Sequence, residues 1–344
     1  MTDAELAAFD QIHAAADRLR AAVAGRIVGQ AEVVDHLIAA VLVEGHTLLI
    51  GPPGLAKTML VRTLAEALGW TFKRVQFTPD MMPSDVVGTE LIQESAGTGG
   101  RELRFAPGPV FTNLLLADEV NRTPPRTQAA LLEAMAERQV TAAGHSRPLD
   151  PPFVVVATQN PIEQEGTYPL PEAQLDRFMF SLRIDYPPAS EERRIIEALP
   201  PDQRLAPVAE AGGVGGGPEP VFSKAEAVEA AGLIRRMPLS DHVRDYALAL
   251  TRASRPGGEG AGGKVERYVG WGAGPRAGQY LVLAAKAWAA MAGQPTPNCE
   301  HVRRAAPAVL THRLVMNFIA SGDGVSAGDV VAELLDSVPE PRGD

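Results

Sequence analysis

The amino-acid sequence predicts an α/β protein in which a doubly wound, parallel five-stranded sheet is followed by a second, smaller helical domain. Five short apolar runs are each separated from the next by helical or loop-like sequence, as in a largely parallel sheet covered on both faces. Past residue 187 the strand pattern stops, and short helical segments are broken by glycine-rich tracts. The 344 residues suffice for two domains, each with its own core.

An N-terminal helix is expected over residues 1–24, where it would pack on the main body. Thr2 and Glu5 have the spacing of a capping box. Apolar residues then recur on one helical face: Leu6, Phe9, Ala16, Leu19 and Val23.

The core domain is expected over residues 25–187. An amphipathic stretch from Val33 to Val41 leads into the first strand, which is the pattern of a helix packed on the sheet. The five apolar runs expected to form the strands are Thr47 to Ile50, Phe72 to Phe77, Leu114 to Ala117, Phe153 to Ala157 and Phe178 to Ile184.

The second domain is expected over residues 188–344 as an all-helical unit. Glycine and proline are dense in residues 211–218, which indicates a linker, and in residues 257–263, which indicates a loop. Pro275 is placed to begin a helix, whose alanine-rich body would end before Gly293.

Composition excludes several classes of protein. The formal net charge is −10, from 42 acidic and 32 basic residues, so nonspecific attraction to nucleic acid or an anionic membrane is expected to be weak. Cys299 is the only cysteine, which excludes an intrachain disulfide and a cysteine-rich metal site. Residues 1–8 carry two acidic side chains and no basic region, and no apolar stretch approaches the roughly 20 residues of a membrane-spanning helix. These features predict a soluble, cytoplasmic protein.

A phosphate-binding loop is predicted at residues 51–58, Gly-Pro-Pro-Gly-Leu-Ala-Lys-Thr, between a strand and a helix. Free amides and the helix dipole favour a polyanion there. Lys57 would reach the β- and γ-phosphates of a nucleotide, and Thr58 would offer its hydroxyl to Mg²⁺. Ala56 stands where the usual pattern has a second glycine, and its methyl group is expected to be tolerated only at negative φ. The residues expected to hold the nucleotide are Gly51, Pro52, Pro53, Gly54, Leu55, Ala56, Lys57, Thr58 and Met59.

Two carboxylates, Asp118 and Glu119, directly follow the third apolar run, at the strand end where ligands bind in open α/β sheets. Asp118 would hold Mg²⁺, usually through water, and Glu119 could orient and deprotonate the water that attacks the γ-phosphate. An ordinary solvated strand end is the alternative, and the phosphate-binding loop upstream favours hydrolysis. Asn160 ends the next strand, where it could touch the attacking water, or else start a turn before Pro161.

Four arginines are further candidates. Arg177, just before the last strand, could project into the nucleotide of a neighbouring subunit, whereas Arg276, at a helix start, could reach the γ-phosphate of its own chain. Arg122 and Arg126 are weaker candidates on the same face, because a lone arginine is usually a solvated surface residue.

These motifs resemble the AAA+ ATPases and, within them, the MoxR family. The likeness runs from Ile27 to Leu314. Its most specific part extends from Phe111 to Pro125 and continues from Thr127 to Met135. Further signatures are Gln76 to Asp80, Thr158 to Pro161, Leu170 to Phe178 and Pro275 to Ala277.

The resemblance implies Mg²⁺-dependent ATP hydrolysis by a ring-forming, hexameric ATPase. Asp118 and Glu119 match the Walker B pair, and Asn160 matches sensor 1. Arg177 matches the arginine finger, acting on a neighbouring subunit, and Arg276 matches sensor 2.

The family likeness also implies partners. It points to a chaperone-like role in remodelling or maturing protein clients, including metal insertion, beside a partner with a von Willebrand A domain. The segment from Asp85 to Pro109 resembles the helix-2 insert of this branch, expected as a hairpin on the ring surface. The segment 257–271 is longer than a minimal lid requires.

Two alternatives remain from other functional classes. A DNA-directed ring motor of the same superfamily is opposed by the net charge of −10. A general protein unfoldase would need aromatic pore loops. Tyr268-Val269-Gly270 has that composition but lies in the lid region, while Val86-Val87-Gly88 lacks the aromatic residue. A noncatalytic nucleotide switch is disfavoured by Glu119 and Arg177.

Overall fold

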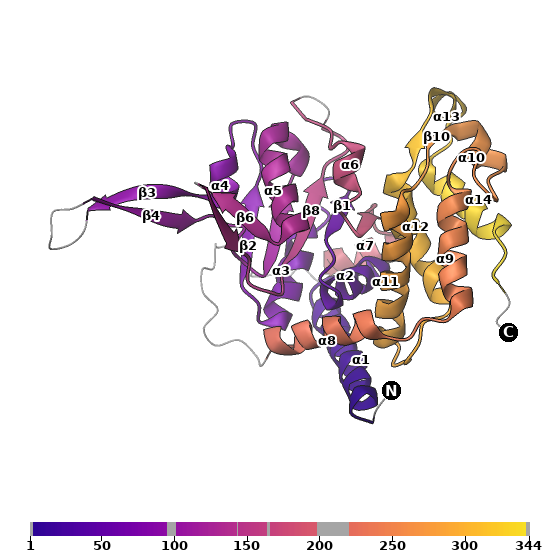
Figure 1. The fold of residues 1–344 in the computed structure, drawn as a ribbon, viewed down its shortest axis with the longest axis horizontal. Helices are drawn as coiled ribbons and strands as arrows, with labels where there is room; N and C mark the ends of the chain where they lie inside the picture. Colours follow the sequence, from indigo (N-terminus) through magenta and orange to yellow (C-terminus); the bar gives the residue numbers. More distant parts are fainter. Residues whose placement is uncertain (1–2, 95–100, 143, 164–165, 198–219, 342–344) are drawn as a thin grey trace.

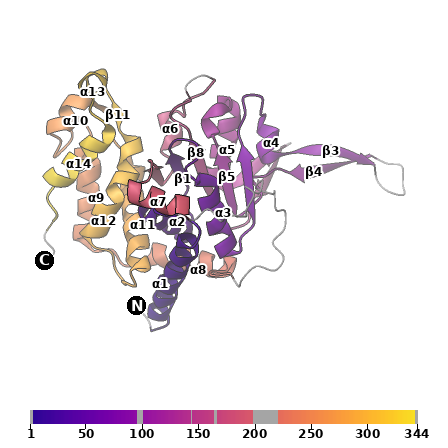
Figure 2. The same cartoon turned by 180° about the vertical axis from the view of Figure 1, so that it is seen from behind.

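The computed structural model describes residues 3–94, 101–142, 144–163, 166–197 and 220–341. An α/β core lies in the middle of the elongated molecule, with a helical lid on one side and a projecting two-stranded hairpin on the other (Figure 1). The view from behind shows the N-terminal helix at the foot of the core, beside the lid (Figure 2). The predicted linker over residues 211–218 lies outside the described residues.

The core is built on a five-stranded sheet in the order β2-β5-β8-β1-β9, with all neighbouring strands parallel. The strands are β1 (Thr47–Ile50), β2 (Phe72–Gln76), β5 (Leu114–Asp118), β8 (Val154–Gln159) and β9 (Phe180–Arg183). The predicted parallel five-stranded sheet is confirmed, and the strand ends lie within two residues of the predicted ones.

Helices cover both faces of the sheet because both faces are apolar. Successive strand residues point to opposite faces, so Leu48 belongs to one hydrophobic cluster and Leu49 to the other. The Leu49 face is covered by α2 (Ala31–Leu42) and α3 (Lys57–Leu68). The Leu48 face is covered by α4 (Pro83–Val87) and α5 (Pro125–Glu137).

The N-terminal helix, α1 (Asp3–Ala24), packs against α2, α3 and α11, and so contacts both the core and the lid. Its predicted apolar face is buried at Phe9, Ala16, Leu19 and Val23. Leu6 is an exception, because it is 44% exposed. The N-terminal end of α1 extends beyond the neighbouring helices in Figure 1, so Leu6 has little to pack against. The capping box at Thr2 lies outside the described residues.

Two antiparallel hairpins interrupt the core. β3 (Gly88–Glu94) and β4 (Arg101–Pro107) form the hairpin predicted for the 85–109 segment. Gly88 has φ 98°, and a Cβ there would lie 2.4 Å from the carbonyl oxygen of Ala106, so only glycine fits. The sequence analysis did not predict the second hairpin, β6 (Gln139–Ala142) with β7 (His145–Pro148).

The lid follows α7 (Ala189–Glu197) and is helical, as predicted. Its helices are α8 (Lys224–Arg236), α9 (Asp241–Ala253), α10 (Gly263–Tyr268), α11 (Pro275–Met291), α12 (Cys299–Leu310), α13 (Phe318–Asp323) and α14 (Ala327–Ser337). It also contains a short antiparallel ribbon that the sequence analysis did not predict, β10 (Val269–Trp271) with β11 (Val315–Met316). Short helical turns lie at α6 (Glu172–Leu175), η1 (Val120–Arg122) and η2 (Thr311–Arg313).

Candidate nucleotide-binding site

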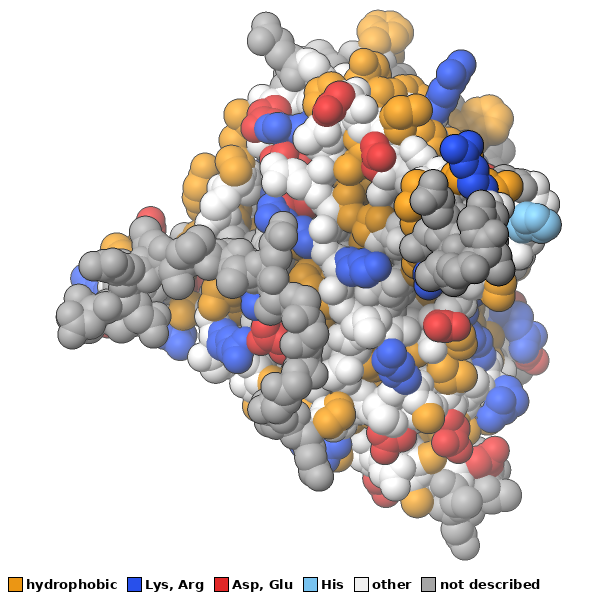
Figure 3. Space-filling view, turned by 90° about the vertical axis from the view of Figure 1, so that its left-hand side faces the viewer, with side chains coloured by type: hydrophobic (Ala, Val, Ile, Leu, Met, Phe, Trp, Pro, Cys, Tyr) orange, Lys and Arg blue, Asp and Glu red, His pale blue; other side chains and the backbone are white. Residues whose placement is uncertain are grey.

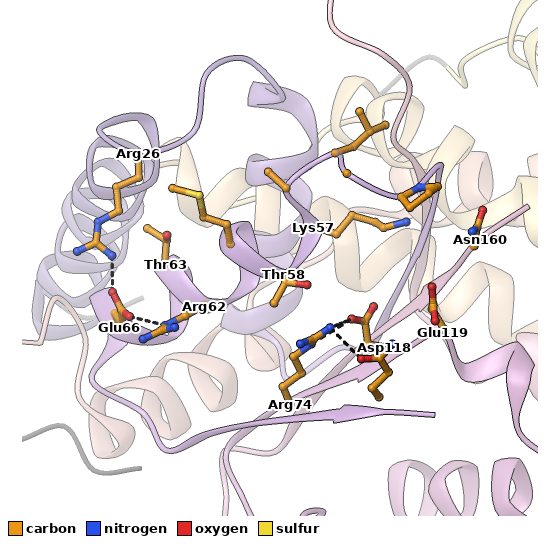
Figure 4. Close-up of a pocket in the computed structure, with 16 residues that line it drawn as sticks. Arg26, Lys57, Thr58, Arg62, Thr63, Glu66, Arg74, Asp118, Glu119 and Asn160 are labelled. Carbon is orange, nitrogen blue, oxygen red and sulfur yellow. Dashed lines mark hydrogen bonds and ion pairs between the residues drawn. The ribbon is translucent and has the colours of Figure 1, made fainter. Parts of the chain in front are cut away.

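A cavity of about 700 Å³ opens at the carboxyl ends of β1 and β5, within the usual size range of small-molecule sites. Figure 4 shows predicted residues from three separate segments around it, with Lys57, Asp118 and Asn160 representing the loop, β5 and the end of β8. The lining residues are Pro53, Gly54, Leu55, Ala56, Lys57, Thr58, Met59, Asp118, Glu119 and Asn160, with Arg26, Arg62, Thr63, Glu66, Arg74 and Gln76.

The loop turns into α3 through a left-handed residue. Ala56 is the N-cap of α3 and has φ 55° and ψ 19°. The expectation that Ala56 keeps a negative φ is therefore wrong. The chain reverses sharply between β1 and α3, and the left-handed position directly precedes the free amides of the helix. A left-handed L-residue costs roughly 1–2 kcal/mol, which the surrounding loop sustains.

The side chain of Lys57 folds back onto the backbone of its own loop. Its Nζ donates hydrogen bonds to the carbonyl oxygens of Gly51 and Pro52. Burial lowers the pKa of Lys57, and the negative charges of Asp118 and Glu119 oppose that shift. A phosphate would replace two neutral carbonyl acceptors with a charged one, which makes a stronger hydrogen bond.

Both carboxylate oxygens of Asp118 accept hydrogen bonds from other residues of the chain. Its Oδ1 accepts a hydrogen bond from the Thr158 hydroxyl at 2.6 Å, and its Oδ2 accepts from Arg74 Nη2 at 2.7 Å and Nε at 3.1 Å. The Thr158 hydroxyl in turn accepts from the backbone N–H of Glu119 at 2.8 Å. The carboxylate orientation is therefore fixed from both neighbouring strands, β2 and β8.

Neither Arg74 nor Thr158 was predicted from the sequence as a site residue. Gln76 pairs with Asp118 across β2 and β5, so Arg74, two residues earlier, shares the same face of the sheet. The signal in the sequence was weak. Arg74 and Gln76 are polar residues two positions apart on a strand whose composition is typical of the edge of a sheet. Thr158 begins the family signature from Thr158 to Pro161, but the signature alone does not indicate a partner for its hydroxyl.

Glu119 adopts a left-handed conformation, with φ 57° and ψ 47°. Such outliers cluster at functional sites, where the surroundings maintain the strain. Its Oε2 lies 3.0 Å from Nε of Arg122, which also pairs with Glu163. Arg122 therefore neutralises Glu119 within the same chain.

Asn160 makes the turn contact that was one of its two predicted roles, and its side chain also lines the cavity. Its Oδ1 accepts a hydrogen bond from the backbone N–H of Ile162 at 3.1 Å, which is the turn-forming role. Its Nδ2 is buried and has no hydrogen-bond partner among the described residues, while the side chain lines the cavity. An unpaired buried donor is costly and is satisfied once an acceptor enters the cavity.

Neither of the two distal arginines lines this cavity. Arg177 Nη1 donates to the carbonyl oxygen of Leu132. Arg276 Nη1 contacts Asp176 Oδ2 at 3.2 Å, at the boundary between the core and the lid. Arg126, the remaining weak candidate, is also absent from the lining.

The residues present fit a hydrated Mg²⁺. The Thr58 hydroxyl and the Asp118 carboxylate are hard oxygen donors on the same side of the cavity (Figure 4), and Mg²⁺ prefers oxygen ligands together with retained water. His36, by contrast, is held by its own chain: its Nδ1 donates to the carbonyl oxygen of Glu32, and its ring packs edge-on against Phe180 and Trp288.

Family models match both parts of the chain. Residues 46–180 match the model of the ATPase family associated with various cellular activities (AAA). Residues 264–334 match that of the AAA lid domain. The two matches correspond to the described core and to most of the described lid.

Relatives match over nearly the full length. The chain is 38% identical to Chaperone MoxR1 of Mycobacterium tuberculosis over 92% of this chain and 80% of that protein. It is 33% identical to Protein MoxR of Paracoccus denitrificans, over 89% and 90% of the two chains. A crystal structure of a Cytophaga hutchinsonii protein superposes with a TM-score of 0.83 at 36% identity, covering 98% of this chain and 97% of the other.

Proposed function

Because the chain belongs to the MoxR family of AAA+ ATPases, we propose that it hydrolyses ATP to ADP and phosphate with Mg²⁺. One observation carries this proposal: Lys57, Asp118 and Glu119, from separate segments, line one cavity. Asn160 adds a buried amide nitrogen that has no hydrogen-bond partner in the described part of the chain. A plain structural turn would need none of these charged groups together.

The contacts around the cavity support a separate role for each of its residues in the proposed reaction. Backbone amides at the start of α3 bind the phosphates, and Lys57 leaves its two carbonyl acceptors for the β- and γ-phosphate oxygens. Thr58 and Asp118 hold Mg²⁺, which when bound neutralises charge on the phosphates. Glu119 orients the attacking water and accepts its proton, and Asn160 Nδ2 positions either that water or the γ-phosphate.

For Glu119 to act as a base, its ion pair with Arg122 has to break. The guanidinium lies 3.0 Å from Glu119 Oε2, so it occupies an oxygen that would have to accept the proton of the attacking water. Arg122 has a second acceptor in Glu163, to which it can remain bound. We propose that nucleotide binding shifts Arg122 toward Glu163.

We propose a hexameric ring in which Arg177 completes the site of the neighbouring subunit. Support comes from the family and from the position of Arg177 outside the cavity of its own chain. Arg276 is proposed as sensor 2, which requires it to exchange Asp176 for phosphate when the lid moves.

The proposed biological role is the remodelling or maturation of protein clients, as the name of the mycobacterial chaperone suggests. A partner with a von Willebrand A domain and metal insertion belong to the same proposal. The β3–β4 hairpin supports contacts with other proteins, because Leu91, Ile92 and Leu103 are 53%, 68% and 66% exposed. We propose that this hairpin lies on the ring surface.

The proposed location is the cytoplasm. No helix in the described ranges is long and apolar enough to cross a membrane. DNA as a substrate is not favoured. On the face shown in Figure 3, Lys and Arg side chains alternate with Asp and Glu, whereas a nucleic-acid track would be uniformly basic.

Phosphate release by purified wild type and by Glu119→Gln tests the proposed activity. The variant should bind ATP with Mg²⁺ at near wild-type affinity, yet hydrolyse it at least about a hundredfold more slowly, because general-base catalysis supplies about 10²–10⁴ in rate. Near-normal turnover by the variant would remove Glu119 as the base. No turnover by the wild type at any protein concentration would remove the proposed activity.

A further inference from the structure

The lid carries a second cavity, of about 730 Å³, that shares no lining residue with the nucleotide cavity. It lies along α9 and α11, with residues from the end of α8 and its connection to α9; the three helices are labelled in Figure 1. Small residues form its floor, Ala247 on α9 and Gly278 on α11. A Cβ at Gly278 would lie 3.3 Å from Thr251 Oγ1, so the two helices approach closely and leave a groove above the contact.

Among the residues that the structure describes, five cations and no acidic residue line the groove. The cations are Arg235, Arg244, Arg252, Arg255 and Lys286. This concentration of positive charge contrasts with the formal net charge of −10 for the chain. A local basic surface on an acidic protein attracts an anionic partner more selectively than a uniformly basic protein does.

Three of the five cations have no carboxylate partner within the described ranges. Arg235 donates to the carbonyl of Val43 at 2.8 Å, and Lys286 donates to the carbonyl of Arg235 at 2.8 Å. Arg255 donates to the carbonyl of Ala273 at 2.9 Å. Backbone carbonyls orient these groups but leave their charge uncompensated. Burial accordingly lowers the pKa of Lys286, with no acidic group opposing the shift.

The remaining two cations have replaceable partners. Arg244 pairs with Asp241 at 2.6 Å and Arg252 with Glu259 at 3.1 Å. These two carboxylates are 83% and 82% exposed, so both ion pairs are solvated and weak. An incoming carboxylate can therefore engage either arginine at little cost.

Apolar side chains lie between the charges. Leu248 on α9 is 52% exposed, and Leu239, Val282 and Leu283 are only partly buried. A groove of this kind, open to solvent and bounded by helices, accepts the apolar face of an amphipathic helix. The combination of an apolar strip with uncompensated cations specifies the chemistry of that helix.

We propose that this groove binds an acidic amphipathic helix of a partner protein, with its apolar face on Leu248 and Val282 and its carboxylates toward Arg235, Arg255 and Lys286. Charge complementarity selects this occupant over a neutral or basic segment. The proposal is independent of ATP hydrolysis, because the two cavities have no residue in common. It assigns partner recognition to the lid.

The test uses a fluorescein-labelled helical peptide of Glu and Leu, with Leu at i, i+3, i+4 and i+7, and measures binding by fluorescence anisotropy. Two comparison peptides carry Lys in place of Glu, or Gln in place of Leu. The wild type should bind only the acidic, apolar peptide, and the affinity should fall as salt rises.

Arg244→Glu combined with Lys286→Glu should weaken this binding at least about tenfold, because like charges then face each other. The matched control, Lys224→Glu with Arg236→Glu, makes the same change in net charge at exposed α8 residues outside the groove, and should keep wild-type affinity. Leu248→Glu is a second test at an exposed position, in case the first variant folds poorly. Circular dichroism and retained ATP binding verify the fold of each variant.

Equal binding by the groove and control variants would overturn the proposal, as would equal binding of the basic peptide or no binding to the wild type. A groove variant that lowers the mass of the assembly while the peptide fails to bind would assign the groove to contacts between copies of this chain. That result would also overturn the proposal.

Discussion

Arg74 donates two hydrogen bonds to a single carboxylate oxygen of Asp118, from Nη2 at 2.7 Å and from Nε at 3.1 Å. The side chain of Asp118 is 11% exposed, and its other oxygen accepts from Thr158. The residue proposed to hold Mg²⁺ is therefore already paired with a cation of its own chain. A Mg²⁺ held by Asp118 would therefore compete with the guanidinium of Arg74 for this carboxylate.

Arg74→Met should therefore lower the Mg²⁺ concentration needed for half-maximal ATP binding, by roughly 3- to 10-fold. The substitution removes both the competitor and a positive charge close to the metal, and such a charge repels by about 1–4 kcal/mol at short range near a protein surface. Titration of Mg²⁺ against a fluorescent ATP analogue measures the effect without any turnover. Arg183→Met is the control, since Arg183 is 80% exposed and pairs with Asp185. An unchanged or higher Mg²⁺ requirement would show that Arg74 only orients the carboxylate.

Ala56 provides a test of backbone geometry in the loop. Glycine adopts φ 55° without strain, so Ala56→Gly should leave ATP affinity and stability within about 1 kcal/mol of the wild type. Ala56→Val should destabilise the protein by more than about 1 kcal/mol and weaken ATP binding, because β-branched residues are outliers at positive φ. Urea unfolding and nucleotide titration of both variants measure these effects. Equal behaviour of the two variants would mean that the loop relaxes to negative φ.

His46 should contribute a stability term that depends on pH. Burial lowers the pKa of His46 from 6.5 to about 4. The ring accepts a hydrogen bond from the backbone N–H of Val155 at Nδ1, and it bonds the carbonyl of Met135 through Nε2, so it is neutral in the folded protein. As pH falls below about 6.5 the unfolded chain binds a proton that the folded chain does not, and stability is lost progressively until about pH 4.

By that pH the loss amounts to roughly 3 kcal/mol. His46→Gln keeps an amide at this position without a titrating group. The free energy of unfolding of the variant should therefore fall less steeply between about pH 6.5 and 4 than that of the wild type. Parallel pH profiles for the two proteins would exclude His46 as the cause.

Asp176 joins the core to the lid. Its carboxylate accepts from Arg313 Nε at 2.8 Å, and the Arg313 side chain is only 2% exposed. Asp176→Ala leaves a buried guanidinium without its carboxylate and should destabilise the protein by roughly 3 kcal/mol. The control Asp185→Ala removes one carboxylate of a solvated pair and should cost under about 1 kcal/mol. Similar losses for both variants in thermal unfolding would show that the Asp176 contact adds nothing.

The sequence predicted the core well because its signals are local. An apolar run with a polar residue at its end identifies a buried parallel strand, and the carboxyl ends of such strands meet at one edge. Lys57, Asp118 and Asn160 could therefore be brought together from the sequence alone. The short ribbon β10–β11 was missed because two or three residues are too few to show an alternating pattern.

Long-range pairings could not be predicted in the same way. The Arg74 contact depends on the register between β2 and β5, which lie about 40 residues apart and carry no turn that fixes it. The hydrogen bond from Arg177 to Leu132 depends on a side-chain rotamer, which sequence does not specify. The left-handed conformation of Ala56 is a local backbone strain, and the composition of the loop does not indicate it.

We propose above all that ATP hydrolysis needs Lys57 from one subunit and Arg177 from its neighbour. Phosphate release by a mixture of Lys57→Ala and Arg177→Ala chains tests it most directly. Each variant alone should be nearly inactive, because an arginine finger can contribute about 10³–10⁵ in rate. In mixed rings an intact Lys57 site meets an intact Arg177, so the mixture should hydrolyse ATP well above the activity of either variant. A mixture that forms joint assemblies yet shows no more activity than the separate chains would contradict the account.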